Sequence, residues 1–460
     1  MNAAEQALRA LTPAALIEQL SAARWFGARG DAITSARLLE VAAMPEQGEE
    51  AEPAALTRVH VCFTSGAAAD YQVPLALHKD GQVRDATQQA SFCRQLAHAF
   101  ARGAEVPTQD GDAAWSFEPL ADLDDLDELP SHPGGGEQSN TSIVYGERAM
   151  LKLYRRLEPG MHPEVEICRF LTTRTQFRGT PPLLGVLRLR TPAGETIAGM
   201  LQAFVPHATD GWSHVLTALK DSAERCDDPG TLGPEIEALG RLTAELHAAL
   251  GSDPDDPDFA PRPTEDADLQ RWRDAAGAQL TTTLARLAAR HTSLPADAAT
   301  AAQALLGRAG ALRARLAAPI SAAAVGPQSR HHGDYHLGQV LHARDGWHII
   351  DFEGEPARTL HERRAPNHPI RDLAGMLRSF AYVAAVAARG EPGAKPSKWE
   401  HTLRTAFLRG YDPTLTQDPE RSALLALFET ERLFYELSYE LGSRPDWAWI
   451  PLAGIAALLP

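Results

Sequence analysis

The chain has 460 residues, of which 44% are hydrophobic and 23% charged, a composition typical of a soluble globular protein. Its 60 acidic and 44 basic residues leave a net charge of −16, which excludes a general attraction to nucleic acid or anionic membranes. The N-terminal residues lack the pattern of a signal peptide, and no apolar run reaches the ~18–20 residues that span a bilayer. We therefore expect a cytoplasmic protein of two or three domains, with neither a nucleic-acid nor a membrane partner.

The first 88 residues predict a small α+β module. Apolar side chains at helical spacing indicate an amphipathic helix over 4–22. After the glycine-containing stretch "RWFGARG" come three strand-like runs, at 33–44, 56–65 and 71–79. We interpret 1–88 as one small α+β module.

The next two modules differ in character. Residues 89–205 contain a helix that starts near 86, a hairpin over 142–157, a helix over 162–174 and a second hairpin over 183–205. Residues 206–460 are largely helical, with Ala/Leu-rich helices predicted over 231–250, 264–291 and 296–318. The pattern predicts an α+β protein of three modules, at 1–88, 89–205 and 206–460, of which the last is mainly helical.

The most informative stretch is "HGDYHLGQVL" at 332–341, followed by "DFEG" at 351–354. Asp334 and Gln339 are five positions apart, like the Asp and Asn of the protein-kinase catalytic loop, and Asp351 stands where kinases have Asp-Phe-Gly. A hairpin with "RDG" as its turn is predicted between them. Phosphoryl transfer needs a carboxylate near the acceptor hydroxyl and hard oxygen ligands for Mg²⁺. We predict Asp334 as the catalytic base and Gln339 with Asp351 as the metal ligands.

Several histidines surround this motif. His336 could contact substrate or metal, but we favour a hydrogen bond to the loop backbone. His331, His342 and His348 are interpreted as incidental surface or strand residues. We disfavour a zinc site, because the nearby carboxylates suit Mg²⁺ and no thiolate is close in sequence.

The upstream hairpin predicts a nucleotide loop. Its turn, "EQSNTS", offers backbone N–H groups and small side chains to phosphates, namely Ser139, Asn140 and Thr141, although it lacks GxGxxG. Lys152 lies on the following strand, where a phosphate-binding lysine is expected. The next helix offers Glu164 and Glu166. We predict that Glu166 pairs with Lys152, because Glu164 stands at the helix start and could merely favour the dipole.

A strand after this region predicts the adenine-binding segment. The run "LQAFVP" at 201–206 is the natural hinge between the lobes. Gln202, Phe204 and Val205 are therefore predicted to bind ATP, with the backbone meeting the adenine.

These motifs together resemble the bacterial maltokinases, eukaryotic-like kinases related to the aminoglycoside phosphotransferases. The resemblance implies a bilobal protein-kinase-like α+β fold, with an N-terminal cap subdomain (1–88), an intermediate nucleotide-binding subdomain (89–205) and a mainly helical C-lobe (206–460) that carries the catalytic loop and the sugar site. The likeness rests on "HGDYHLGQVL", "IIDFEGEPA", "ERR" and "RDLAGMLRSF", with "RWFGARG", "EQSNTSIVYG", "DGW" and "YELSYELGSRPDWAWIPL" elsewhere. It implies the reaction of ATP with maltose to give maltose 1-phosphate and ADP, in glycogen and trehalose-linked metabolism, with Mg²⁺ as cofactor and trehalose synthase as a possible partner. One departure is "GARG", where the family often has a lysine.

The catalytic motif does not identify the sugar, because relatives with a similar loop phosphorylate glucosamine. The alternatives are a glucosamine or aminoglycoside kinase and, from another class, a nucleotide-binding pseudokinase. The complete set of Lys152, Asp334, Gln339 and Asp351 argues against a pseudokinase. Asp372, at a helix start, is interpreted as a brace for the catalytic loop. The predicted substrate residues are His332, Arg371, Tyr435, Glu436, Tyr439, Glu440 and Trp447.

Overall fold

The structure is a computed structural model that describes residues 8, 11–26, 31–45, 52–134, 139–224, 232–391 and 394–458. It divides into two units, one formed by 1–174 and 181–206, the other by 175–180 and 207–460. Most of the predicted 4–22 helix is seen as α2 (Pro13–Ala22), which Thr12 caps and which begins with a proline. Residues 1–7, 9–10, the "GARG" segment 27–30 and residues 135–138 lie outside the described residues.

The first sheet of the first unit carries the predicted N-terminal strands. Its order is β11-β3-β2-β4-β5, with β1 also paired to β2. The strands are β1 (Ile33–Ala43), β2 (Ala54–Phe63), β3 (Ala68–Gln72), β4 (Leu75–Leu77), β5 (Val83–Asp85) and β11 (Arg156–Leu157). Because β11 comes from far along the chain, residues beyond 88 complete this sheet. The predicted division of this unit at residue 88 stays a prediction.

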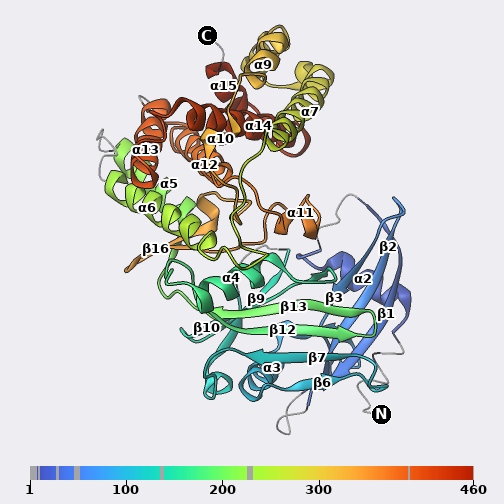
Figure 1. The fold of residues 1–460 in the computed structure, drawn as a ribbon. Helices are drawn as coiled ribbons and strands as arrows, with labels where there is room; N and C mark the ends of the chain where they lie inside the picture. The colour runs from blue at the N-terminus through green and yellow to red at the C-terminus, as the bar shows by residue number, and fades with distance from the viewer. Residues whose placement is uncertain are drawn as a thin grey trace. The chain divides into compact units, whose positions relative to one another are not determined.

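The second sheet of the first unit is antiparallel, in the order β6-β7-β12-β13-β10-β9-β8. Its strands are β6 (Glu105–Pro107), β7 (Ala114–Pro119), β8 (Ser131–Pro133), β9 (Thr141–Tyr145), β10 (Ala149–Leu153), β12 (Leu183–Thr191) and β13 (Gly194–Ala203). Both predicted hairpins are therefore confirmed. Helix α3 (Ala90–Arg102) lies against β7 (Figure 1), and α4 (Pro163–Arg174) packs on β12.

Buried polar groups join the two sheets of this unit. The indole N–H of Trp115 on β7 donates to the side-chain oxygen of Gln72 on β3 at 3.0 Å. Arg155, 1% exposed, donates to Asp85 Oδ2 at 2.7 Å. Burying a charge is costly unless it is paired, so Arg155 is held at Asp85. Because Arg155 comes two residues after β10, this pair fixes the end of β10 relative to the first sheet.

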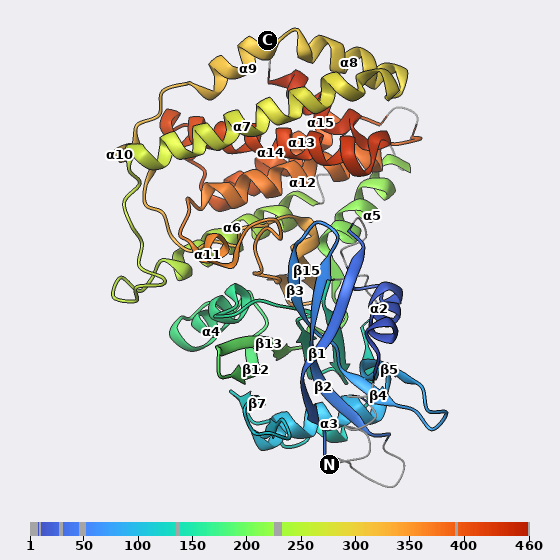
Figure 2. The same ribbon diagram turned by 90° about the vertical axis from the view of Figure 1, so that its right-hand side faces the viewer.

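The second unit is mainly helical, which confirms the predicted C-terminal character. Helices α7, α14 and α12 pack in successive layers (Figure 2), and α13 packs on α6. The helices are α5 (Gly211–Glu224), α6 (Gly233–Leu250), α7 (Asp266–Arg290), α8 (Ala296–Leu306), α9 (Ala309–Leu316), α10 (Ala322–Val325), α11 (Leu360–Arg364), α12 (Ile370–Ala387), α13 (Pro396–Tyr411), α14 (Pro419–Ser443) and α15 (Trp449–Ala457).

A three-stranded sheet interrupts these helices. It has the order β14-β15-β16, with β14 (Thr209–Asp210), β15 (Val340–Ala343) and β16 (Gly346–Ile349). The pairing of Val340 with Ile349 and of Ala343 with Gly346 confirms the hairpin predicted between the two acidic motifs. No helix among the described residues is long and apolar enough to cross a membrane.

Candidate active site

The loop that carries Asp334 is held by a buried carboxylate at the start of α12. Asp372 accepts hydrogen bonds from the backbone N–H groups of His332 (2.7 Å) and Gly333 (2.9 Å). Its other partner is His247 Nε2, at 3.0 Å. Burial would raise the pKa of Asp372, but the neighbouring histidines and these hydrogen bonds outweigh it and leave the pKa well below its usual value. Asp372 is thus ionised and braces the loop, as predicted.

The loop also packs directly on the backbone of α12. A Cβ on Gly375 would lie 2.5 Å from the carbonyl oxygen of Tyr335, so only glycine permits this approach. The N–H of Leu337 donates to Ser379 Oγ at 2.9 Å, one helical turn further along. Because these contacts are with a long packed helix, the position of Asp334 is set by rigid secondary structure.

The hairpin that follows brings the two predicted metal ligands to one end. Gln339 ends a short 3₁₀ turn, and its carbonyl oxygen accepts the N–H of Ile350 at 3.0 Å. Asp351 is the next residue. Its φ is 68°, in the left-handed region, a conformation that is uncommon without glycine and costs about 1–3 kcal/mol. A polar side chain held in this way is typical of functional sites.

Asp334 has a cationic partner that the sequence analysis did not predict. Arg432, on α14, donates to Asp334 Oδ1 at 3.0 Å and to Glu355 Oε1 at 3.1 Å. Burial would lower the pKa of Arg432, but Asp334 and Glu355 raise it instead. Burial likewise favours a raised pKa for Glu355, yet the charges of Arg358 and Arg432 hold that pKa below its ordinary value. One guanidinium therefore bridges two carboxylates, those of Asp334 and Glu355.

The two histidines of the loop have structural positions. His332 is 1% exposed, and its Nε2 hydrogen-bonds to the carbonyl oxygen of Ile350 at 2.9 Å. Its ring is buried against Phe352 and joins the two acidic motifs, and substrate contact by His332 stays a prediction. His336 Nδ1 accepts the N–H of Gly338 at 3.0 Å, which confirms the predicted backbone contact.

Two pockets of the second unit adjoin Asp334. The first is lined by Asp334, Glu355, Arg358, Arg371, Asp372, Glu431 and Arg432, among others. Arg371, predicted to contact substrate, lies in this pocket, where it donates to Glu431 Oε2 at 2.9 Å and stacks on Phe428. The pocket is consequently lined by alternating carboxylates and guanidiniums.

The second pocket contains most of the predicted sugar-binding segment. Its lining includes Trp212, Asp334, His336, Arg432, Tyr435, Glu436, Tyr439 and Glu440. Tyr435 and Tyr439 are 42% and 48% exposed, so their rings are accessible. Glu436 pairs with Arg378, and Glu440 pairs with Arg444. Trp447 is not among the residues that line this pocket, and its ring stacks on Arg444.

In the first unit, the predicted lysine is present but its partner differs. Lys152 Nζ lies 2.9 Å from Glu164 Oε2, and Tyr154 donates to the same oxygen at 2.7 Å. The prediction that Glu166 forms this pair is therefore wrong. Residues two apart on a helix point to different faces, so Glu164 and Glu166 cannot both face the lysine. Helix α4 begins at Pro163, so Glu164 already lies within the helix, on the face that meets Lys152.

The predicted phosphate loop and hinge are seen in part. Asn140 Oδ1 accepts the N–H of Arg155, and Thr141 Oγ1 accepts its Nε–H at 2.8 Å, so both side chains brace the strand that follows Lys152. Ser139 lies in a bend at the loop's described end. Phosphate binding by these three residues stays a prediction.

The predicted hinge residues lie at the end of β13, the central strand of the second sheet, and directly after it. Gln202 lies on β13 between Met150 and Leu183, and Phe204 N–H donates to the carbonyl oxygen of Arg148 at 3.0 Å. Val205 comes next, half-buried, at the end of the first unit. Adenine binding by this segment stays a prediction.

The chain matches the APH phosphotransferase enzyme family over residues 128–425, which is more than half of its length. It belongs to this phosphotransferase family. The matched range contains Lys152 and Glu164 of the first unit, and Asp334 and Asp351 of the second. Arg432 and the aromatic face of α14 lie beyond its end, in a part of the chain to which the family match does not extend.

Curated relatives of this phosphotransferase are glucosamine kinases. One, from Mycolicibacterium smegmatis, is 29% identical over 334 residues, which cover 70% of this chain and 78% of the relative. Another, from Streptacidiphilus jiangxiensis, is 28% identical over 415 residues, covering 86% and 87%. These names correspond to the amino-sugar alternative better than to the maltokinase resemblance.

Solved structures confirm the kinase-like fold of the phosphotransferase. A glucosamine kinase in complex with glucosamine, ADP and inorganic phosphate superposes with a TM-score of 0.70 at 23% identity, covering 99% of both chains. A second crystal form of a glucosamine kinase gives a TM-score of 0.73 over the same coverage. Similarity at this level of identity establishes the fold, including a curled-sheet unit and a helical unit.

Proposed function

We propose that this phosphotransferase is an ATP-dependent sugar kinase whose acceptor is an amino sugar of the glucosamine class. The coarser statement, a sugar-kinase-type phosphotransferase, follows from the family. The finer one is supported by the carboxylates that line the pocket beside Asp334 and by the names of the relatives.

The residues of the second unit suit phosphoryl transfer. Asp334 is proposed to accept the proton of the attacking hydroxyl, and Arg432 to hold the carboxylate in the required direction. Gln339 and Asp351 offer an amide and a carboxylate oxygen from one end of a hairpin, a donor set that fits Mg²⁺. When bound, Mg²⁺ supplies positive charge to the phosphates of the nucleotide.

The first unit supplies the complementary positive charge. Lys152, held by Glu164, is proposed to bind phosphate oxygens. A lysine fixed by a buried carboxylate presents its ammonium in one direction, which reduces the entropy lost when the nucleotide is positioned. An aminoglycoside kinase would use the same proton acceptor, metal ligands and phosphate-binding lysine.

The carboxylates that line the first pocket, beside Asp334, are the observation that carries the choice of an amino sugar. Asp334, Glu355 and Glu431 all line it, and their arginine partners occupy only part of their hydrogen-bonding capacity. An ionised carboxylate accepts up to about four hydrogen bonds, so these groups can also accept from a substrate ammonium. A neutral hydroxyl at the same place gains less from such acceptors.

Maltose is the second candidate, and a different observation favours it. Tyr435 and Tyr439 present two exposed rings on one face of α14, within the pocket that also contains Asp334. Aromatic faces of this kind pack against the apolar faces of neutral sugars, and a disaccharide is long enough to cover both.

The test is a coupled ADP-release assay with Mg-ATP. Glucosamine, N-acetylglucosamine, glucose, maltose and kanamycin are compared, and NMR identifies the phosphorylated position. We expect the highest kcat/KM with glucosamine and a large loss with N-acetylglucosamine, because acetylation removes the positive charge. Preferential turnover of maltose to its 1-phosphate would overturn the amino-sugar assignment, and no ADP release with any sugar would overturn the kinase assignment.

A further inference from the structure

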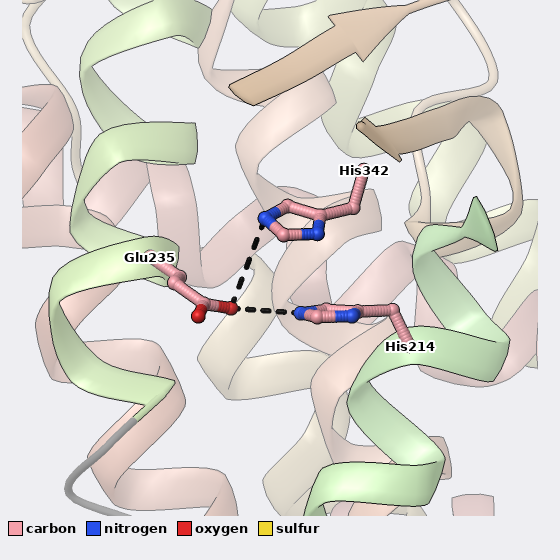
Figure 3. A group of neighbouring side chains, drawn as sticks. All are labelled: His214, Glu235 and His342. Atoms are coloured by element: carbon pink, nitrogen blue, oxygen red, sulfur yellow. Dashed lines mark hydrogen bonds and ion pairs between the residues drawn. The ribbon is translucent and has the colours of Figure 1, made fainter. Parts of the chain in front are cut away.

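A second cluster of metal-ligating side chains lies in the second unit, separate from the residues assigned above. It consists of His214 on α5, Glu235 on α6 and His342 on β15 (Figure 3). His214 Nε2 is 2.7 Å from Glu235 Oε2, and His342 Nε2 is 4.0 Å from the same oxygen. All three ligand atoms lie within 4.8 Å of one another.

The backbone around this cluster is tightly fixed. Thr209 on β14 pairs with His342, and α5 begins two residues later. A Cβ on Gly211 would lie 2.5 Å from a methyl group of Val340 and 2.8 Å from the carbonyl oxygen of Leu337, so the start of α5 lies directly against β15. His214 is therefore held beside His342 by close packing and not by chance contact of surface side chains.

Trp347 forms one wall of the cluster. Its indole N–H donates to the carbonyl oxygen of Glu235 at 2.9 Å, which joins α6 to the hairpin. The rings of His214 and His342 stack with centroids 4.0 Å apart, and both contact Trp347. The two imidazoles are thereby aligned, with an Nε2 atom of each directed at one carboxylate oxygen, as Figure 3 shows.

The donor set decides which cation fits. Two imidazole nitrogens and one carboxylate suit Zn²⁺ and similar transition metals, whereas Mg²⁺ prefers oxygen ligands. With metal–ligand bonds of about 2.0–2.2 Å, tetrahedral ligand atoms lie about 3.3 Å apart. The observed separations bracket this value, so small side-chain rotations would close the site. We propose that His214, Glu235 and His342 bind one Zn²⁺-class ion, with water in the fourth position.

Such an ion would connect three elements that are distant in sequence. It would join α5, α6 and the β15–β16 hairpin, whose opposite end carries Gln339 and Asp351. The proposal assigns a role to His342, which the sequence analysis interpreted as incidental. Neither ligand histidine belongs to the proposed catalytic residues, so binding can be measured independently of turnover.

The experiment titrates metal-free full-length protein with Zn²⁺, and separately with Mg²⁺, by calorimetry. The variants His342→Gln and Glu235→Gln are compared with His348→Gln, a matched control on β16 whose Nε2 pairs with Asp345 and lies outside the cluster. We expect one Zn²⁺ per chain, a higher thermal unfolding temperature and quenched tryptophan fluorescence with Co²⁺. Both cluster variants should lose these effects, and the control should keep them.

Two outcomes would overturn the proposal. One is Zn²⁺ binding that is the same in the cluster variants as in the control, which would place the ion elsewhere. The other is the absence of stoichiometric Zn²⁺ binding and of a nitrogen-ligated Co²⁺ absorption spectrum in the unaltered protein. The Co²⁺ spectrum keeps the test decisive even where a variant folds poorly.

Discussion

The catalytic loop and the pocket-facing side of α14 meet at Asp334, but the chain encodes them in different ways. Residues 332–354 carry their functional groups at fixed spacings along one loop and hairpin. The α14 side contributes Arg432, which is 98 positions from its partner Asp334. The first kind of site is determined by local backbone geometry, whereas the second depends on which helix packs beside the loop. Substitutions in the two regions should therefore have different signatures.

The largest effect is expected at Asp334. Asp334→Asn removes the proposed proton acceptor while keeping the shape of the side chain, so kcat should fall about 10²–10⁴-fold. Nucleotide affinity should change little, because Lys152, the proposed phosphate ligand, is unaffected. Steady-state ADP release and a fluorescent-nucleotide titration measure the two quantities. Asp345→Asn, an exposed residue in the turn of the same hairpin, is the control, and near-normal turnover of Asp334→Asn would exclude its role as the base.

Arg432 tests the contribution of α14 to the same step. Arg432→Ala removes charge-assisted hydrogen bonds to two carboxylates, each worth about 1.5–3 kcal/mol, and should lower kcat about 10–100-fold. Arg432→Lys should restore little, since an ammonium cannot bridge two carboxylates as a guanidinium fork does.

The matched control for Arg432 is Arg404→Ala. It breaks another arginine–glutamate pair of α14, with Glu429, away from Asp334. Thermal unfolding should respond to both alanine variants, but kcat only to Arg432→Ala. Equal losses of kcat in the two variants would show that Arg432 acts through stability alone.

Much of the fold could be predicted because it is local. The alternating pattern of 142–157 predicted the β9–β10 hairpin, and the "RDG" turn predicted β15–β16. The loop and hairpin that carry Asp334, Gln339 and Asp351 could be predicted for the same reason, since these residues lie in one continuous segment, whereas the contacts with α12 that hold the loop could not.

The remaining parts of the site depend on tertiary packing. Arg432 precedes Tyr435 by three residues and therefore shares its helical face. This spacing could have placed Arg432 beside the predicted sugar-binding residues. Its partners, Asp334 and Glu355, could not be inferred from spacing. The partner of Lys152 was wrongly predicted because the choice between Glu164 and Glu166 depends on the rotation of α4 over the sheet.

The corrected pair in the first unit gives a smaller, discriminating effect. Glu164→Gln keeps the size of the side chain but removes the charge that holds Lys152, so the KM for Mg-ATP should rise about tenfold, equivalent to about 1.4 kcal/mol. Glu166→Gln is the matched comparison on the same turn of α4 and should raise the KM less. A larger rise with Glu166→Gln would mean that the second carboxylate is the one that positions the lysine during turnover.

The last effect concerns stability, not turnover, and involves two buried histidines of the second unit. Burial lowers the pKa of His331 and of His368 to about 4, and the charge of His247 adds to the effect at both. His368 Nε2 faces the carbonyl oxygen of Val325 at 3.0 Å, and its Nδ1 accepts the N–H of Ile370. The neutral His368 ring can therefore donate to Val325 and accept from Ile370 at the same time. A second ring proton, on Nδ1, would point at the N–H of Ile370 and remove that hydrogen bond.

The sign of the pH dependence follows from these depressed pKa values. The ordinary histidine pKa is 6.5, so between about pH 6.5 and about pH 4 the unfolded chain binds more protons than the folded one. Stability should thus fall on acidification across that window, by at most about 1.4 kcal/mol per pH unit for each histidine. Urea unfolding followed by circular dichroism at several pH values measures the slope. His368→Gln retains a donor and an acceptor, and should reduce the slope by about half of the two-histidine contribution; an unchanged slope would show that His368 titrates normally.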